Sequence, residues 1–177
     1  MKDEGLYGLA AEFESDAQLM HAAEEAYGRG YRKMDGYTPF PIAGLAEALG
    51  KRNRIPLLVL CSGILGGCSA YFMEWFASVI SYPINIGGRP LHSWPSFIPI
   101  TFELTVLGAS LTAFFFSLGL SGLPQPYHPM FNLPAFERAS QDRFFLCIEA
   151  EDTLFDAGAT REFLQSLKPL TVSEVAK

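Results

Sequence analysis

The sequence predicts an α+β protein: a ferredoxin-like, split βαβ domain that is interrupted by a hairpin of two transmembrane helices. Two observations lead to this prediction. The middle of the chain is almost free of charged residues, and a pattern of strand, helix and strand occurs once before this region and once after it. We therefore expect the chain to leave the domain, cross a membrane twice and return to complete the same domain.

Two apolar segments predict the transmembrane helices. They cover residues 55–80 and 96–120, and each contains one charged residue. Both are longer than the roughly 20 residues that a helix needs to cross a hydrocarbon core of about 30 Å. Two buried core helices are the alternative, but a small soluble domain rarely contains two such segments. Only 18% of the chain is charged, less than in most soluble domains, and we expect both helices to contact membrane lipids.

The basic residues beside these segments predict their orientation. KRNR at 51–54 directly precedes the first segment, whereas the connecting loop, 81–95, contains only Arg89. Lys and Arg are enriched in the cytoplasmic flanks of membrane helices. We therefore expect both termini in the cytoplasm and the loop on the external side.

The first half of the cytoplasmic domain is predicted within residues 1–54. Residues 5–13 resemble a strand, and residues 16–30 have apolar side chains at helical spacing behind Ser15, a suitable N-cap. Residues 31–40 resemble a second strand.

The second half is predicted within residues 143–177 by the same pattern. Its strand, helix and strand are expected at 143–150, 155–167 and 170–176. The segment before it, 121–142, is a proline-rich connector, and its prolines at 124–134 predict an extended conformation on the membrane surface. Two small αβ lobes that pack on a partner, and not on each other, remain the alternative architecture.

Composition and motifs argue against several kinds of site. A formal net charge of −6 without a large basic cluster argues against a nucleic-acid partner. The chain has no CxxCH or CxxC motif and no glycine-rich nucleotide motif. The cysteines and histidines do not form a recognisable ligand set (Cys61, Cys68, Cys147, His21, His92, His128). We expect no catalytic residue, no metal and no cofactor bound by this chain.

Small residues predict where the two membrane helices touch. Gly63 and Gly67 are about one helical turn apart, and Ala109 and Ala113 offer a matching face on the second helix. Small side chains let two helix backbones approach closely. Chance spacing of small residues is the alternative.

The two carboxylates inside the apolar segments are the remaining candidates. At 1.5 Å per residue, Glu74 lies about 29 Å along a helix that begins at Ile55, and Glu103 lies about 10 Å from Ser96. Both are thus expected toward the external side. A carboxylate at membrane depth costs about 2–3 kcal/mol and normally faces protein, water or a partner charge. The interpretations are a structural contact with neighbouring helices, a proton path in a larger complex, and, for Glu74, extension to the interface.

Several longer stretches indicate a family. They are YGLAAEF, GYRKMDGYTPFPIAGLAEALG, YPINIGGRPLHSWPSFIPITFELTVL, GLPQPYHPMFN and DRFFLCIEAEDTLFDAGATREFL. Over about residues 5–168, the chain resembles the ActD subunit family of bacterial alternative complex III, a quinol:electron acceptor oxidoreductase unrelated to cytochrome bc1. The GGRP, SWP and TFE motifs are the most specific part of this resemblance.

The resemblance implies a two-span subunit of the bacterial inner membrane with a cytoplasmic αβ domain. Its partners would be NrfD-like quinol-type membrane subunits, cytochrome c subunits and an iron–sulfur subunit. In this family, haem c and the iron–sulfur clusters belong to those partners, and the D subunit holds no cofactor. The implied function is a non-catalytic subunit that supports assembly of a respiratory complex that oxidises quinol.

Two other functions stay open at this point. Glu74 and Glu103 are candidates for proton transfer, which would make the chain a direct participant in energy conversion. A membrane-anchored sensor domain of the ferredoxin-like type is the other possibility.

Overall fold

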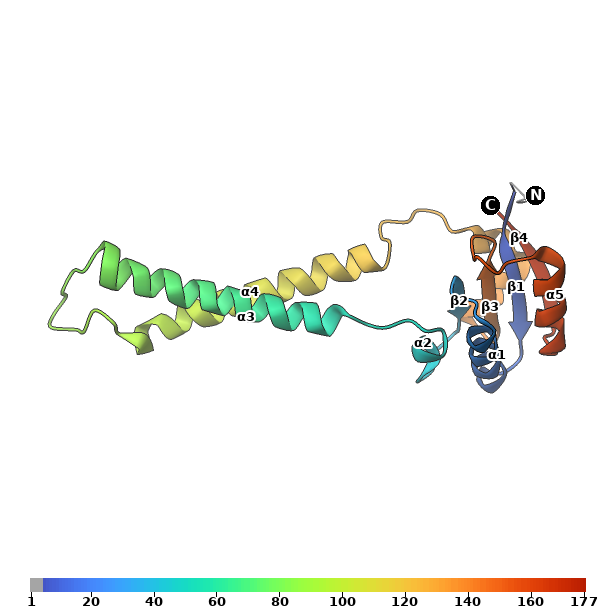
Figure 1. Ribbon diagram of the computed structural model, residues 1–177, viewed down its shortest axis with the longest axis horizontal. Helices are drawn as coiled ribbons and strands as arrows, with labels where there is room; N and C mark the ends of the chain where they lie inside the picture. The colour runs from blue at the N-terminus through green and yellow to red at the C-terminus, as the bar shows by residue number, and fades with distance from the viewer. Residues whose placement is uncertain (1–4) are drawn as a thin grey trace. The chain divides into compact units, whose positions relative to one another are not determined.

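The computed structural model describes residues 5–177. Residues 1–4 of the expected segment 1–54 lie outside the described residues. The chain divides into two compact units (Figure 1). Residues up to Arg52 together with Pro126–Lys177 form one unit, and Asn53–Gln125 form the other.

The first unit is a mixed αβ domain built on a four-stranded antiparallel sheet. Its strands are β1 (Leu6–Phe13), β2 (Met34–Tyr37), β3 (Phe144–Glu149) and β4 (Thr171–Ala176). They are arranged in the order β2-β3-β1-β4, and every neighbouring pair is antiparallel. Because β1 pairs directly with β3, the two halves of the domain share one sheet, and the alternative of two separate lobes is wrong.

Two helices pack on one face of the sheet. They are α1 (Asp16–Arg29) and α5 (Ala157–Ser166). The hydroxyl of Ser15 accepts a hydrogen bond from the backbone of Gln18 and so caps the start of α1. Gly30 ends that helix with a φ of 104°, a left-handed conformation that glycine adopts without steric cost.

The central strands are buried on both faces, which explains their almost continuous apolar sequence. Leu9 of β1 and Leu146 of β3 lie in the core under the helices. Ala10 of β1 and Cys147 of β3 face the opposite side, where they pack with Met130. A single layer of helices therefore does not complete this domain.

The connector supplies the missing cover on that second face. It forms two 3₁₀ helices, η2 (Pro129–Asn132) and η3 (Pro134–Ser140). Met130 and Ala139 from these helices are buried against the sheet. The extended conformation expected for 124–134 is therefore wrong where η2 and η3 form, from Pro129 to Asn132 and from Pro134 onward. Its prolines occupy the first positions of the two helices, where a missing N–H group is tolerated.

The segment after α1 also differs from the expected strand at 31–40. β2 has four residues, because Thr38 turns the chain by donating to the carbonyl of Phe40 and the following prolines cannot donate to a sheet. A short helix, α2 (Leu45–Ala48), then buries Leu45 in the core. No pattern in the sequence predicts this turn of helix.

The second unit is a helical hairpin. It contains α3 (Ile55–Trp75), a π-helical continuation η1 (Phe76–Ser81) and α4 (Trp94–Leu120). Both long helices, Ile55–Ser81 and Trp94–Leu120, are long and apolar enough to cross a membrane. α4 begins two residues before the expected position, because Pro95 fits the first turn of a helix.

Asp152 fixes the loop after β3 to the start of β2. Its carboxylate accepts hydrogen bonds from the backbone N–H groups of Arg32 at 2.6 Å, Lys33 at 2.7 Å and Leu154 at 2.9 Å. Burial of Asp152 opposes ionisation, but these backbone donors outweigh it, and the pKa lies below its usual range.

We predict that Asp152→Asn lowers the free energy of unfolding by about 1–3 kcal/mol at neutral pH, because an amide cannot satisfy three donors as a carboxylate does. A lowered pKa gives stability that is present above the ordinary aspartate pKa and is lost as the pH falls through the folded value. The difference between wild type and variant should therefore shrink toward about pH 3. Urea unfolding of the full chain in detergent, followed by circular dichroism, measures both effects. Glu162→Gln on the exposed side of α5 is the control, and an equal loss in this control would contradict the prediction.

Candidate functional site

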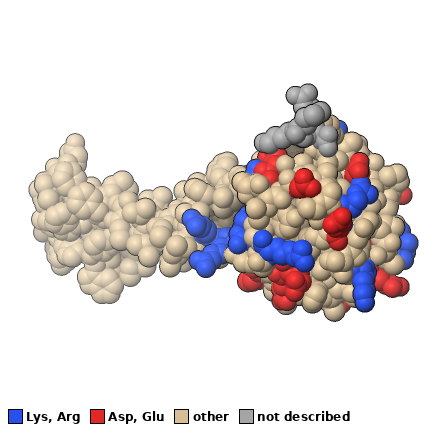
Figure 2. Space-filling model, turned by 45° about the vertical axis from the view of Figure 1, so that its right-hand side comes forward, with Lys and Arg blue, Asp and Glu red and all other residues tan. Residues whose placement is uncertain are grey.

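The two units differ in their content of charged residues. Figure 2 shows acidic and basic side chains gathered over the αβ domain, whereas the drawn surface of the hairpin is almost entirely uncharged. Most side chains of α3 and α4 are exposed in the isolated chain. Each helix thus offers a large apolar surface, on which the few polar groups stand out.

The contact between α3 and α4, which we call the seam, depends on glycine. A β-carbon on Gly63 would lie 3.6 Å from that of Ala109, an ordinary contact. A β-carbon on Gly66 would lie only 2.5 Å from the backbone oxygen of Leu104, and one on Gly67 would lie 2.5 Å from the hydroxyl of Thr105. The two backbones therefore approach more closely than alanine allows.

Three of the four predicted seam residues lie in the contact between the helices, and the fourth is only partly buried there. Gly63 and Gly67 are buried in α3, and Ala109 lies opposite Gly63. Ala113 is half-buried. The residue opposite Gly67 is Thr105, so a face made of alanines alone does not describe the α4 side.

Hydroxyl groups that sequence reasoning missed complete the seam. Ser62 donates to the carbonyl oxygen of Gly108 at 2.9 Å, and Thr112 donates to Ser62 at 2.7 Å. Thr105 donates to the carbonyl of Thr101 within α4. The spacing of 101, 105, 108 and 112 is that of one helix face, and this pattern is the signal that could have identified them.

Glu74 belongs to the seam. It follows Gly63, Gly67 and Ala70 at intervals of four, three and four residues, which places all four on one face of α3. Its carboxylate lies beside Thr101 of α4. Within residues 5–177, the buried atoms Glu74 Oε2 and Thr101 Oγ1 have no hydrogen-bond partner. The seam therefore ends at a polar pair that is not fully satisfied inside the chain.

Glu103 occupies a different place. It is exposed on α4, two residues from both Thr101 and Thr105, and two residues correspond to about 200° around a helix. It therefore points away from the seam, and the chain does not bring the two predicted carboxylates together.

The end of the hairpin where the loop joins α3 to α4 holds an apolar groove of about 520 Å³. Tyr71 of α3 is hydrogen-bonded to His92 of the loop at 2.7 Å, and its ring meets Phe97 edge to face. Trp75 and Thr101 also line this groove. The loop is thus held against α3 by aromatic contacts and one hydrogen bond.

The αβ domain has its own polar cluster around His128. Its Nδ1 atom accepts from the backbone of Met130 at 3.2 Å, so the hydrogen of the neutral ring is on Nε2. That nitrogen lies 3.4 Å from the hydroxyls of both Tyr7 and Tyr37, and Tyr7 donates to Glu149. His128 thereby ties the connector to the sheet.

Burial controls the titration of the two tyrosines in this cluster. Desolvation raises the pKa of Tyr7, with a further contribution from Glu149, and it also raises the pKa of Tyr37. The buried thiol of Cys147 has its pKa raised to about 12 for the same reason. Neutral tyrosines and an unreactive thiol indicate a structural cluster.

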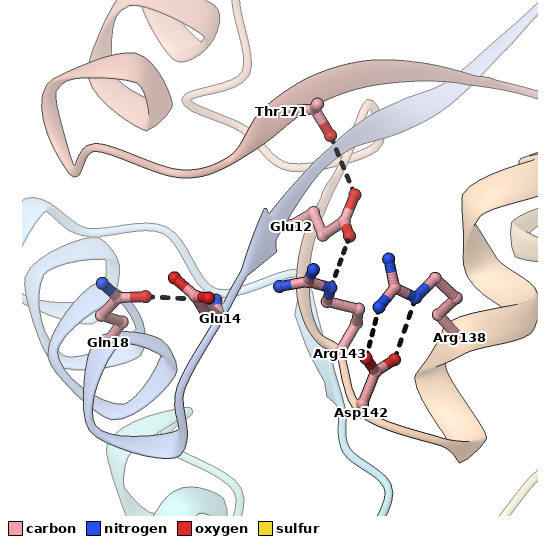
Figure 3. A network of polar contacts seen from close by, with 7 residues as sticks. All are labelled: Glu12, Glu14, Gln18, Arg138, Asp142, Arg143 and Thr171. Carbon is pink, nitrogen blue, oxygen red and sulfur yellow. Dashed lines mark hydrogen bonds and ion pairs between the residues drawn. The ribbon is translucent and has the colours of Figure 1, made fainter.

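A second network joins the ends of three strands (Figure 3). Glu12 of β1 is almost buried, and it lies 3.4 Å from Nε of Arg143 and accepts from Thr171 at 3.1 Å. Arg138 pairs with Asp142 through two hydrogen bonds beside them. The contacts of Glu12 join β1 to β4 and to the residue before β3, and the Arg138–Asp142 pair closes the turn after η3.

The αβ domain also has a surface hollow of about 710 Å³. Lys33, Asp152, Asp156 and Lys177 are among its lining residues, and the mixture of signs favours no single ligand class. In the described part of the chain, no three His, Cys, Asp or Glu side chains gather as a metal site would require.

The comparisons with known proteins give one family. The sequence model of the family described as "Alternative complex III, ActD subunit" matches residues 7–174. No curated protein matches the chain.

We predict that Gly66→Ala destabilises the hairpin by about 1–3 kcal/mol, because the new methyl group forces α3 away from the Leu104 carbonyl. Gly119→Ala is the matched control, since a β-carbon there meets nothing within 4 Å. The full chain in mild detergent can be titrated with dodecyl sulfate while the fluorescence of Trp75 and Trp94 is followed. Equal midpoints for the two variants would show that the close approach is unimportant.

We predict that ionisation of Tyr7 and Tyr37 accompanies alkaline unfolding. A raised pKa means that the stability these groups provide is complete below the ordinary tyrosine value of about 10 and is lost as the pH rises toward the folded value. The free energy of unfolding should fall between about pH 9 and pH 11, and the variant Tyr7→Phe/Tyr37→Phe should show a smaller fall. Tyrosinate absorbance and circular dichroism report the two events. The exposed Tyr82, changed to Phe, should leave the slope unaltered; a slope that is unaltered in the double variant too would refute the coupling.

Proposed function

Because the chain belongs to the ActD subunit family of alternative complex III, we propose that it is a non-catalytic integral membrane subunit that supports assembly of this respiratory, quinol-oxidising complex. The observation that carries the proposal is the family match, which covers residues 7–174 and thus both structural units. Other subunits of the same complex are its partners.

The hairpin is the membrane-spanning part in this proposal. Two helices of 27 residues each are available, and at 1.5 Å per residue each extends about 40 Å, enough for a bilayer core. The sheet also bears on the membrane topology. Because β1 precedes the hairpin, β3 follows it and the two strands pair, both ends of the hairpin belong on one side of the membrane. The basic residues at 51–54 make the cytoplasm the preferred side, in the inner membrane of a bacterium.

We further propose that the αβ domain is a variant of the ferredoxin-like plan. The strand order β2-β3-β1-β4, with a helix between β1 and β2 and another between β3 and β4, supports this assignment. The connector η2 and η3 covers the sheet face opposite α1 and α5. The sensor-domain alternative has less support, because the sheet face that would be open to a ligand is covered by η2 and η3, with Met130 and Ala139 buried against it.

The redox groups are assigned to the partners in this proposal. Haem c and iron–sulfur clusters need cysteine or histidine ligands. Here Cys61 and Cys68 lie exposed on the hairpin and Cys147 lies buried in β3. The proposed partners are NrfD-like quinol-type membrane subunits, cytochrome c subunits and an iron–sulfur subunit. The role left to this chain is to hold such subunits together through the hairpin.

The proposal predicts that the tagged chain, purified from its native membrane in mild detergent, brings down haem c-containing, iron–sulfur and large membrane subunits in constant proportion. Haem absorbance and mass spectrometry of the eluate measure this. A chain that purifies alone, or with unrelated proteins, overturns the proposal.

Deleting the chain tests whether it is non-catalytic. The amount of assembled complex should fall, while the rate of quinol oxidation per haem in the complex that remains should be unchanged. A rate of quinol oxidation per haem that is well below the wild-type rate would show that this subunit takes part in turnover.

A further inference from the structure

The outward face of α4 carries polar residues at a strict interval. Ser96, Glu103, Ser110 and Ser117 are each seven residues apart, and all four are exposed. Seven residues make about two turns of helix, so these side chains form one stripe about 32 Å long. We call it the outer stripe.

The outer stripe faces away from α3. Glu103 lies about 200° around the helix from Thr101 and Thr105 of the seam. Gly108, whose carbonyl accepts from Ser62 of α3, is likewise two residues from Ser110. α4 therefore has two polar faces on opposite sides, of which α3 covers one.

The described residues offer no ion-pair partner for the carboxylate in this stripe. Within residues 5–177, none of the ion pairs includes Glu103. Arg89 is the one Lys or Arg between Ile55 and Leu120, and it lies in the loop before α4. A cation at the level of Glu103 must come from another molecule.

Lipid is a poor occupant for this face. Glu103 lies about 14 Å along α4 from Trp94, which is inside the hydrocarbon core of a helix that spans the membrane. An ionisable side chain at that depth is costly unless it meets protein or water. A second copy of the chain is also a poor occupant, because parallel packing along this stripe sets Glu103 against Glu103.

The serines suit a close helix contact. Ser96 donates to the carbonyl of Ser93 at 2.7 Å, and Ser110 donates to that of Leu107 at 3.1 Å. Their hydroxyl hydrogens are thus satisfied within α4, and their oxygens remain able to accept a hydrogen bond. Small side chains repeated every seven residues match the packing of two helices with a left-handed crossing.

We infer that the outer stripe packs against a transmembrane helix of another subunit of the complex, and that this helix presents a Lys, Arg or other strong hydrogen-bond donor to Glu103. The inference rests on the proposed function, since it requires the hairpin to span the membrane within an assembly. The contact with Glu103 fixes the depth of the partner helix, and the serines fix its distance.

Photo-cross-linking tests the position of the partner. A benzoylphenylalanine is placed at Ser110 in the full chain and, in a separate variant, at Leu111, which is also exposed but lies about 100° around the helix. In native membranes the probe at Ser110 should cross-link to one larger membrane protein several times more strongly than the probe at Leu111. Labelling of lipid alone, of a second copy of this chain, or of the same protein equally from both positions overturns the inference.

A substitution tests the charge. Glu103→Leu removes the costly carboxylate, so the variant should reach the membrane at least as well as wild type. It should nevertheless be lost from the purified complex several-fold, because the donor on the partner is left unpaired. Phe102→Leu, at the next position and also exposed, should be retained. Retention of Glu103→Leu at the wild-type level overturns the inference.

The outcomes separate this inference from the proposed function. If the wild-type chain co-purifies with haem-containing subunits but the probe at Ser110 cross-links only to lipid, the proposed function is supported and the inferred contact of the outer stripe is wrong. If the wild-type chain does not co-purify with them, both fail.

Discussion

The antiparallel pairing of β1 with β3 is the interaction on which the rest of the structure depends. It joins segments on either side of the hairpin, from Gly8 with Glu149 to Phe13 with Phe144. Closing so long a loop costs conformational entropy, which grows only slowly with length. The two strands recover this cost by burial on both faces. Everything else in the domain, including α1, α5 and the connector, packs on this central pair.

Glycine has a comparable role in the hairpin. The close contact at Gly66 and Gly67 brings the hydroxyls of Ser62 and Thr112 within hydrogen-bonding distance and places Glu74 beside Thr101. Helices in lipid gain little from apolar contact with each other, so packing and hydrogen bonds decide whether they associate. The seam uses both, and it leaves the outward side of α4 available for a second contact.

Hydropathy and strand patterns predict most of this architecture from the sequence, because long apolar runs and central strands have strong local signals. The extended conformation is wrong only where Pro129 and Pro134 begin 3₁₀ helices, because a proline favours an extended chain as much as the first turn of a helix. Glu103 illustrates a different limit. Its depth follows from counting residues, but its direction follows only once Thr101 and Thr105 are known to face α3. Similarly, the link between His128 and two tyrosines joins residues that no local pattern relates.

The split of the sheet between the two ends of the chain has a consequence for biosynthesis. When a ribosome has made β1, α1 and β2, the strand that belongs between β1 and β2 does not yet exist, because β3 follows the hairpin. The sheet closes only after the hairpin has been synthesised. In the proposed membrane topology, insertion of only one helix leaves β1 and β3 on opposite sides of the bilayer, and their edges stay unpaired. Formation of the sheet thus requires that both ends of the hairpin lie on the same side.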